Sequence, residues 1–393
     1  MTSTLITSNS EIAGVADSAR AAGRIGLDTE FMRERTYRAR LCLVQIATPE
    51  GIHLIDAVAA EELKPVAELI ADERVEIVLH AGRQDLEIFY ERFELLPTKV
   101  FDVQLAAAFA AYGSSLPYGR LVQAITGARL TKGESYSDWC RRPLSAEQLR
   151  YAADDVAYLL DMSDRLKQQL AEQGRARWAE EEMAIFEAPE TYVFDPDAAY
   201  RKVSGRGSLS GRQMTILRSV ARWREETAQK RDIPRGWVIK DPTLVEIARR
   251  APADIDALKR LRGMNASEAE RSGREILAAI EAGKGGTEIE QPKALSRAAQ
   301  IRSRMLAGPA DAIVRARCEA AGIATELVST RGELEALLAD VTGGIEDLGR
   351  HRMMQGWRRT LAGDHVVAFA RGDIAIRASD SPPYVEEIPL GGS

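Results

Sequence analysis

The first ~175 residues alternate between strand-like and helix-like patterns, and this alternation limits the possible folds more than any other feature of the chain. Apolar runs typical of strands occur at residues 25–31, 41–46, 52–55, 76–80 and 100–101. Pro49 and Gly51 separate the second run from the third, as in a hairpin. Helical patterns follow at residues 60–71 and 83–96. Three consecutive strands and then alternating strands and helices predict an α/β fold, with a mixed five-stranded sheet flanked by helices.

The remainder of the chain reads as helical and is divided by two irregular stretches. Prolines and glycines gather between residues 189 and 208, and Gly283, Gly285 and Gly286 mark a second break. We therefore expect a first domain, a linker, two small all-helical domains of similar size and a loose tail. Their predicted ranges are 1–188, 189–208, 209–286, 287–380 and 381–393. The similar size and helical character of the two C-terminal domains suggest a diverged duplication.

Charge is distributed unevenly along the chain. The net charge is −6, yet residues 201–280 hold 18 Lys and Arg against 10 Asp and Glu. A basic helical module attached to an acidic remainder is typical of proteins that contact phosphates. A solvated helical surface that happens to be basic explains the charge alone equally well.

Nothing in the sequence indicates a membrane or secreted protein. No stretch approaches the ~20 apolar residues of a membrane span, and residues 1–10 lack the pattern of a secretion signal. The three cysteines, Cys42, Cys140 and Cys318, are far apart and form no CxxC pair. This spacing predicts neither a zinc site nor a disulfide framework, and it favours the reducing cytoplasm.

Two carboxylates share one face of the first predicted strand. Asp28 and Glu30 are two residues apart, so their side chains point the same way from the sheet. Adjacent carboxylates repel each other unless a cation lies between them. An ordinary strand end near solvent would carry the same acid pair, which is common when taken alone.

Two further clusters add candidate acids. Asp85 falls in the first turn of the helix after the fourth strand, where the helix dipole alone would favour it. Tyr151 and Asp155 lie one turn apart on one face of a later helix, with Asp154 as a rival for that face. Taken alone, each of these positions can also be explained by an ordinary structural role. The same is true of Asp102, whose position fits a helix N-cap.

Together the four carboxylates fit two divalent cations. Hard cations such as Mg²⁺ and Mn²⁺ prefer oxygen ligands. A pair of them can activate water on one side of a phosphodiester and stabilise the leaving oxygen on the other. A tyrosine hydroxyl, with an ordinary pKa near ~10, would stay neutral and orient the attacking water.

Three motifs resemble those of the ribonuclease D family, in the tyrosine branch of the DEDD superfamily. They are the segments around Asp28 and Glu30, around Asp85, and from Tyr151 to Asp155. The segment from Asp232 to Trp237 resembles the HRDC domain of ribonuclease D and RecQ-type helicases, and residues 287–380 form a plausible second copy. The resemblance covers nearly the whole chain.

The resemblance implies a ribonuclease H-like catalytic domain in residues 1–188 and hydrolysis of RNA from its 3′ end. The products would be nucleoside 5′-monophosphates, and the substrates tRNA precursors and other small structured RNAs. Asp28, Glu30 and Asp155 would hold one metal ion, with Asp28 bridging to a second. Asp85 would complete the second site, and Tyr151 would position the water. No obligate protein partner is implied.

Further residues are candidates for binding RNA, two of them near Asp85 and three in the basic module. The predicted RNA-binding residues are His80, Gln84, Arg222, Arg235 and Lys240. Tyr200 and Trp237 could stack on unpaired bases. For the tryptophans Trp223 and Trp237, however, we expect the core of a small helical domain.

Two alternatives remain at this point. A DNA 3′→5′ exonuclease would use the same chemistry, although neither a polymerase nor a nucleotide-binding loop is evident in the sequence. A non-catalytic RNA-binding protein descended from such a nuclease would normally have lost a ligand, whereas all four acids and the tyrosine are present.

Overall fold

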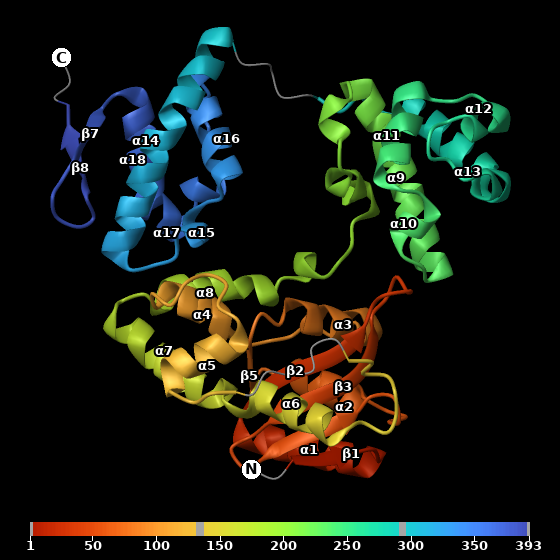
Figure 1. Ribbon diagram of the computed structural model, residues 1–393, viewed down its shortest axis with the longest axis vertical. Helices are drawn as coiled ribbons and strands as arrows, with labels where there is room; N and C mark the ends of the chain where they lie inside the picture. Colours follow the sequence, from red (N-terminus) through yellow and green to blue (C-terminus); the bar gives the residue numbers. More distant parts are fainter. Residues whose placement is uncertain (1–2, 131–136, 291–295, 391–393) are drawn as a thin grey trace.

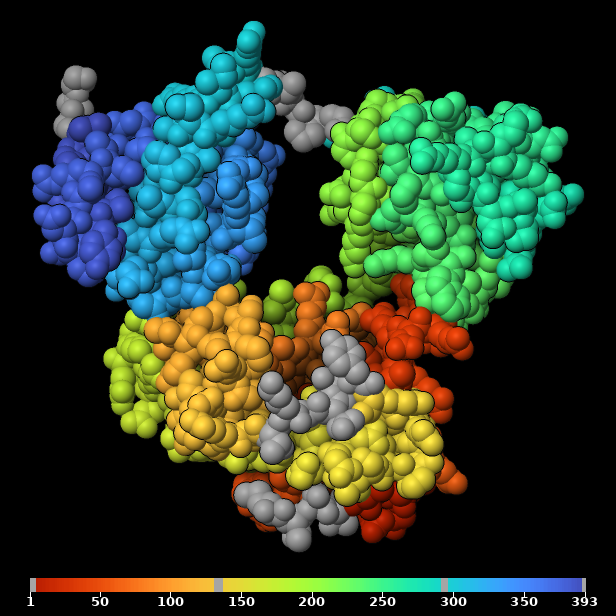
Figure 2. All heavy atoms as spheres, viewed as in Figure 1, coloured from red at the N-terminus to blue at the C-terminus, as the bar shows by residue number. Residues whose placement is uncertain are grey.

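The computed structural model describes residues 3–130, 137–290 and 296–390, which form three lobes (Figure 1). The first lobe holds the sheet. A second, green lobe and a third, blue lobe stand apart from each other above it (Figure 1). Figure 2 shows the surface hollowed between these two lobes, over the first.

The first lobe is built on a six-stranded mixed sheet of order β1-β4-β3-β2-β5-β6. β3 runs antiparallel to β2 and β4, and the other neighbouring strands are parallel. The strands are β1 (Ser3–Ile6), β2 (Arg24–Met32), β3 (Arg40–Ala47), β4 (Ile52–Asp56), β5 (Glu76–Leu79) and β6 (Val100–Asp102). The predicted fold class is confirmed.

The expected number of strands was one too few. The additional strand, β1, pairs with β4 at the edge of the sheet. It contains only two apolar residues, Leu5 and Ile6, and Leu5 is exposed while Ile6 is buried. So short a run gives no alternating pattern that a reading of the sequence could detect.

Helices cover both faces of this sheet. They are α1 (Asn9–Ala22), α2 (Lys64–Ile70), α3 (Arg83–Phe93), α4 (Val103–Phe109), α5 (Tyr118–Thr126), α6 (Ala146–Ala157), α7 (Leu159–Glu172) and α8 (Ala176–Met183). α6 packs across β2, β3 and β4. A Cβ at Gly26 of β2 would lie 3.2 Å from the Cβ of Leu159, so glycine allows the start of α7 to approach β2 closely.

The second lobe is helical and has a core of its own, with Leu217, Leu244 and Ile276 among its buried residues. Short 3₁₀ turns lead into it: η1 (Ala184–Phe186), η2 (Pro189–Thr191), η3 (Pro196–Lys202) and η4 (Arg206–Ser208). Its helices are α9 (Gly211–Arg231), α10 (Arg235–Val238), α11 (Asp241–Arg250), α12 (Ile255–Lys259) and α13 (Ala266–Gly285).

The two tryptophans of this lobe differ in burial. Trp223 lies in the core and donates its indole N–H to Glu275 at 3.0 Å, as expected. Trp237 is 61% exposed, so the expectation of a core position was wrong for it. α10 is only four residues long, and Val238 is the buried residue of this helix.

The third lobe is mostly helical and ends in a β-hairpin. Its elements are α14 (Arg297–Ala321), α15 (Thr325–Val328), α16 (Arg331–Thr342), η5 (Arg352–Met354), α17 (Gly356–Arg358), η6 (Arg359–Gly363), α18 (Asp364–Arg371), β7 (Ile374–Ala378) and β8 (Val385–Pro389). β8 pairs antiparallel with β7. The prediction of an all-helical domain at 287–380 is therefore wrong for β7, and that of a loose tail at 381–393 is wrong for its described part. Pro382 and Pro383, which suggested irregular chain, lie in the turn between the two strands.

The third lobe shares its core with the first. Trp357 stacks on Trp178 of α8 and meets Phe109 of α4 edge-on, both with ring centroids 5.2 Å apart. Its indole N–H donates to Glu182 at 3.2 Å, and Arg358 forms an ion pair with the same carboxylate. The two lobes are thus joined by buried aromatic packing.

The second lobe meets the first through polar contacts. Asp232, at the end of α9, accepts the backbone N–H groups of Tyr37 and Arg38 at 3.1 and 3.0 Å. Gln229 donates to the Tyr37 hydroxyl at 3.2 Å. This junction therefore combines a few hydrogen bonds to the loop between β2 and β3 with the packing of Tyr37 against the core of the second lobe.

Cys42 of β3 and Cys140 form a disulfide, with their Cα atoms 5.2 Å apart. This corrects the prediction that the three cysteines form no disulfide; Cys318 is free and buried. The paired residues are separated by 98 positions in the chain, and only the fold brings them together. Arg142 strengthens the same junction by donating to the Cys42 carbonyl at 2.8 Å and pairing with Asp56 at 2.5 Å.

Candidate active site

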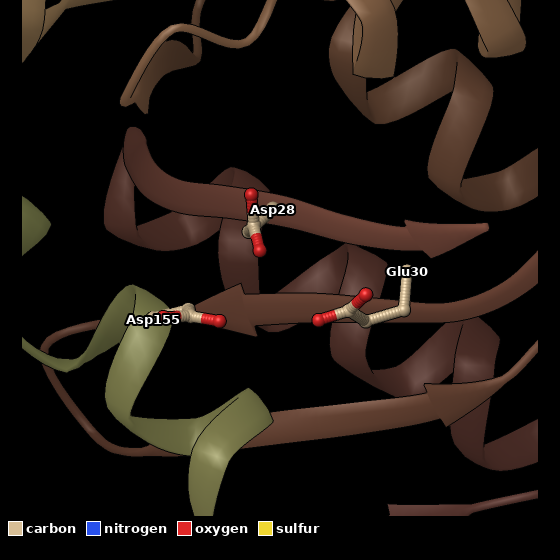
Figure 3. Close-up of side chains that lie close together, drawn as sticks. All are labelled: Asp28, Glu30 and Asp155. Atoms are coloured by element: carbon tan, nitrogen blue, oxygen red, sulfur yellow. The ribbon is translucent and has the colours of Figure 1, made fainter. Parts of the chain in front are cut away.

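Three of the predicted carboxylates meet beside β2. Asp28 and Glu30 project from one face of this strand, and Asp155 reaches them from α6 (Figure 3). One carboxylate oxygen from each lies within 4.8 Å of the others, and all three side chains are half-buried. This arrangement of oxygen ligands suits a hard divalent cation.

The fourth predicted acid, Asp85, adjoins this cluster in the first turn of α3. The chain turns sharply before it: Ala81 has a φ of 55°, and the Gly82 N–H donates to the buried Asp102 at 3.3 Å. Thr29 lies between the two acids in the sequence of β2 and donates its hydroxyl to Asp85. Asp85 is therefore held in place by a neighbour of the acids on β2.

The crowded acids raise one another's pKa values. Burial, followed by the charges of Asp85, Asp155 and Glu30, raises the pKa of Asp28 well above its usual range. Burial, followed by the charges of Asp155 and Asp85, raises the pKa of Glu30 to about 8. Burial raises the pKa of Asp155 to about 7, against a hydrogen bond from Tyr151 that lowers it. A bound cation would offset this repulsion.

Tyr151 lies one helical turn before Asp155, as its spacing predicted. Ser145 and Gln148 form a capping box that fixes the start of α6. The indole of Trp139 packs against the Tyr151 ring, with centroids 5.9 Å apart. Burial and the charge of Asp155 raise the pKa of the Tyr151 hydroxyl, which therefore keeps its proton at neutral pH.

Two predicted RNA-binding residues, His80 and Gln84, belong to the first lobe and lie close to Asp85 in the sequence. His80 ends β5, and its Nε2 lies 3.0 Å from the Leu116 carbonyl oxygen. Its ring meets that of Tyr118 edge-on at 5.5 Å, so the contacts of His80 are those of a structural residue at the end of a strand. Gln84 is exposed in the first turn of α3.

The three candidates in the second lobe lie on separate elements. Arg222 of α9 pairs with Glu226 at 2.8 Å, and Arg235 of α10 pairs with the buried Glu225 at 3.0 Å. Lys240 is exposed and precedes α11. Two of the three cations thus already have carboxylate partners.

Two supporting residues were not assigned to the site from the sequence. Thr29 was overlooked because strand alternation places it on the face opposite Asp28 and Glu30. Asp102 was correctly read as an N-cap, since it accepts the N–H groups of Gln104 and Leu105. Its second role, holding the turn before Asp85, depends on a contact between segments that are distant in sequence.

Comparisons with known families agree with this geometry. The family model of a 3′-5′ exonuclease matches residues 4–171, and that of the HRDC domain matches residues 213–280. The second HRDC-like copy at 287–380 and the boundaries proposed for the domains stay predictions.

Whole-chain relatives point the same way. Ribonuclease D of Granulibacter bethesdensis is 37% identical over 95% of this chain and 94% of its own, and that of Gluconacetobacter diazotrophicus is 37% identical over 94% and 93%. The crystal structure of Escherichia coli RNase D, an exoribonuclease involved in structured RNA processing, matches with a TM-score of 0.81 and 29% identity. That match covers 94% of this chain and 99% of the other. The chain therefore belongs to the ribonuclease D family of 3′–5′ exoribonucleases.

Proposed function

We propose that this exoribonuclease hydrolyses the terminal phosphodiester with two divalent cations, Mg²⁺ or Mn²⁺, and releases nucleoside 5′-monophosphates. The observation that carries the proposal is the cluster of Asp28, Glu30 and Asp155, whose oxygens lie within 4.8 Å of one another. Bound cations would activate the attacking water and stabilise the leaving oxygen.

The side chains divide this work. Asp28, Glu30 and Asp155 would hold the first ion, and Asp28 would also help to hold the second. Asp85, fixed by the Thr29 hydroxyl, completes the second position directly or through water. Tyr151 keeps its proton and orients the attacking water by hydrogen bonding.

We infer that the natural substrates are tRNA precursors and other small structured RNAs with unpaired 3′ ends. The excess of positive charge in residues 201–280 supports this, because Lys and Arg bind phosphates without reading sequence. The exposed Trp237 offers a surface on which an unpaired base could stack. The E. coli relative, described as acting on structured RNA, favours RNA over DNA as the substrate.

The proposal requires no membrane and no protein partner, and it places the enzyme in the cytoplasm, where RNA precursors are made. Among the described residues, no helix combines the length and apolar character needed to cross a membrane.

A tRNA with additional 3′ nucleotides tests the proposal. The full-length enzyme should shorten it stepwise in Mg²⁺ or Mn²⁺, and the released mononucleotides should carry 5′-phosphates. Chelation should stop the reaction. Asp28→Asn should abolish hydrolysis but retain RNA binding, and a single-stranded DNA of equal length should be cut more slowly.

Substantial activity in Asp28→Asn would remove this residue from the mechanism. Faster degradation of DNA than of RNA would instead favour the alternative of a DNA exonuclease. RNA binding without hydrolysis by the parent enzyme would favour a non-catalytic protein.

A further inference from the structure

A cavity of about 620 Å³ opens directly beside the candidate metal site. One wall belongs to α6, including Tyr151 and Asp155, and the other to α5 and the residues that follow it. Arg120 and Gln123 lie one turn apart on α5, and Arg129 follows the end of this helix. The volume lies within the range of sites that enclose a nucleotide-sized ligand, about 300–1,000 Å³.

The two arginines of this cavity, Arg120 and Arg129, have no ion-pair partner among the described residues. Both are exposed, and neither makes an ion pair or a side-chain hydrogen bond within the described parts of the chain. By contrast, Arg222 and Arg235 of the second lobe are paired with carboxylates. No ion pair with a described residue therefore competes with an incoming anion at Arg120 or Arg129.

The cavity wall is held in place before any ligand binds. The Tyr118 hydroxyl donates to the backbone carbonyl of Asp154 at 3.1 Å and accepts the N–H of Tyr158 at 3.4 Å. The edge contact from His80 fixes the other side of the Tyr118 ring. These contacts tie α5 to α6, so the backbone that carries Arg120 is held in position relative to Asp155. Such preorganisation lowers the entropic cost of positioning a substrate.

We propose that this cavity binds the phosphodiester backbone of the RNA 3′-terminal nucleotides, with Arg120 and Arg129 as positioning residues. This proposal rests on the proposed function. A guanidinium matches two phosphate oxygens at once, and an RNA end brings one negative charge per nucleotide toward an otherwise acidic site. Gln123 also lines the cavity and offers a neutral hydrogen-bonding group beside the two arginines. The carboxylates would thus hold the metal ions, and the arginines would hold the RNA strand on which the metal ions act.

Kinetics on a single-stranded RNA in Mg²⁺ test the two arginines. Arg120→Ala and Arg129→Ala should each raise KM about tenfold, the loss expected for a charge-assisted hydrogen bond, with a smaller effect on kcat. The slope of log KM against log salt should decrease by about 0.7 for each arginine removed. Arg120→Lys and Arg129→Lys keep the positive charge, so they should keep most of the slope of log KM against log salt. Arg177→Ala, an exposed arginine on α8 outside the cavity, is the matched control.

A fluorescently labelled RNA, titrated in Ca²⁺ in place of Mg²⁺, measures binding apart from hydrolysis. The double alanine variant should bind about a hundredfold more weakly than the parent, from the two tenfold losses combined. If its affinity, KM and salt slope equal those of Arg177→Ala, the proposal is wrong. If the parent binds RNA without cutting it, the proposed function is wrong. In that case the affinities measured in Ca²⁺ still show whether Arg120 and Arg129 bind the RNA strand.

Discussion

Replacing Glu30 by glutamine should stabilise the metal-free enzyme in alkaline solution, although it removes a proposed metal ligand. In the folded protein, burial and the charges of Asp155 and Asp85 raise the pKa of Glu30 from 4.5 to about 8. The carboxyl group thus binds its proton more tightly in the folded than in the unfolded state. Its contribution favours folding below about pH 4 and is lost as the pH rises toward 8.

The size of the effect follows from this difference in pKa. A shift from 4.5 to about 8 corresponds to roughly 5 kcal/mol, at about 1.4 kcal/mol per pKa unit, once the group is ionised in both states. Neighbouring acids that take up a proton relieve part of this repulsion, so we expect Glu30→Gln to gain about 2 kcal/mol near pH 9. That gain corresponds to a rise in Tm of about 4–8 °C, and it should vanish near pH 4.

Thermal unfolding of parent and variant in chelator, over a series of pH values, measures this gain. Added Mn²⁺ should narrow the difference, because the parent gains about 2.7 kcal/mol at a hundredfold excess over Kd and the variant, lacking one ligand, gains less. Gln45 of β3 pairs with Asp28 across the sheet but carries no charge. A substitution of Gln45 is therefore the control for changes near this cluster that remove no charge. A Glu30→Gln variant that is less stable than the parent at every pH in chelator would refute the idea that the ionised Glu30 carboxylate destabilises the metal-free fold.

Two further changes test the neighbouring structure. Tyr151→Phe should lower kcat by about ten- to a hundredfold and leave RNA affinity nearly unchanged, as measured by steady-state kinetics and a binding titration; unchanged kcat would reassign the residue to packing. Trp357→Ala should destabilise the enzyme by about 3–5 kcal/mol in denaturant unfolding, because a large aromatic leaves a cavity between two lobes; a loss below about 1 kcal/mol would show that this contact is dispensable.

Local periodicity predicted much of the site. The spacing of Asp28 and Glu30 in a strand, and of Tyr151 and Asp155 in a helix, is enough to place each pair on one face. It also gave Asp85 its place in the first turn of α3. That β2 and α6 meet came from family resemblance, because no local pattern records which distant segments pack together.

The remaining features depend on contacts that periodicity does not encode. The Cys42–Cys140 disulfide joins residues 98 positions apart. The edge strand β1 is too short to show a pattern. Arg120 and Arg129 resemble any exposed arginines in the sequence, and only the fold places them beside Asp155.

The packing of Trp357 changes how truncated enzymes should be interpreted. A chain cut before Arg297 would leave Phe109 and Trp178 facing water, so a fall in activity could reflect damage to the nuclease itself rather than a lost RNA contact. The second lobe has a core of its own and meets the nuclease through a few hydrogen bonds and the packing of Tyr37. Excising that lobe internally, with a flexible bridge in its place, is the cleaner way to ask what an accessory module does.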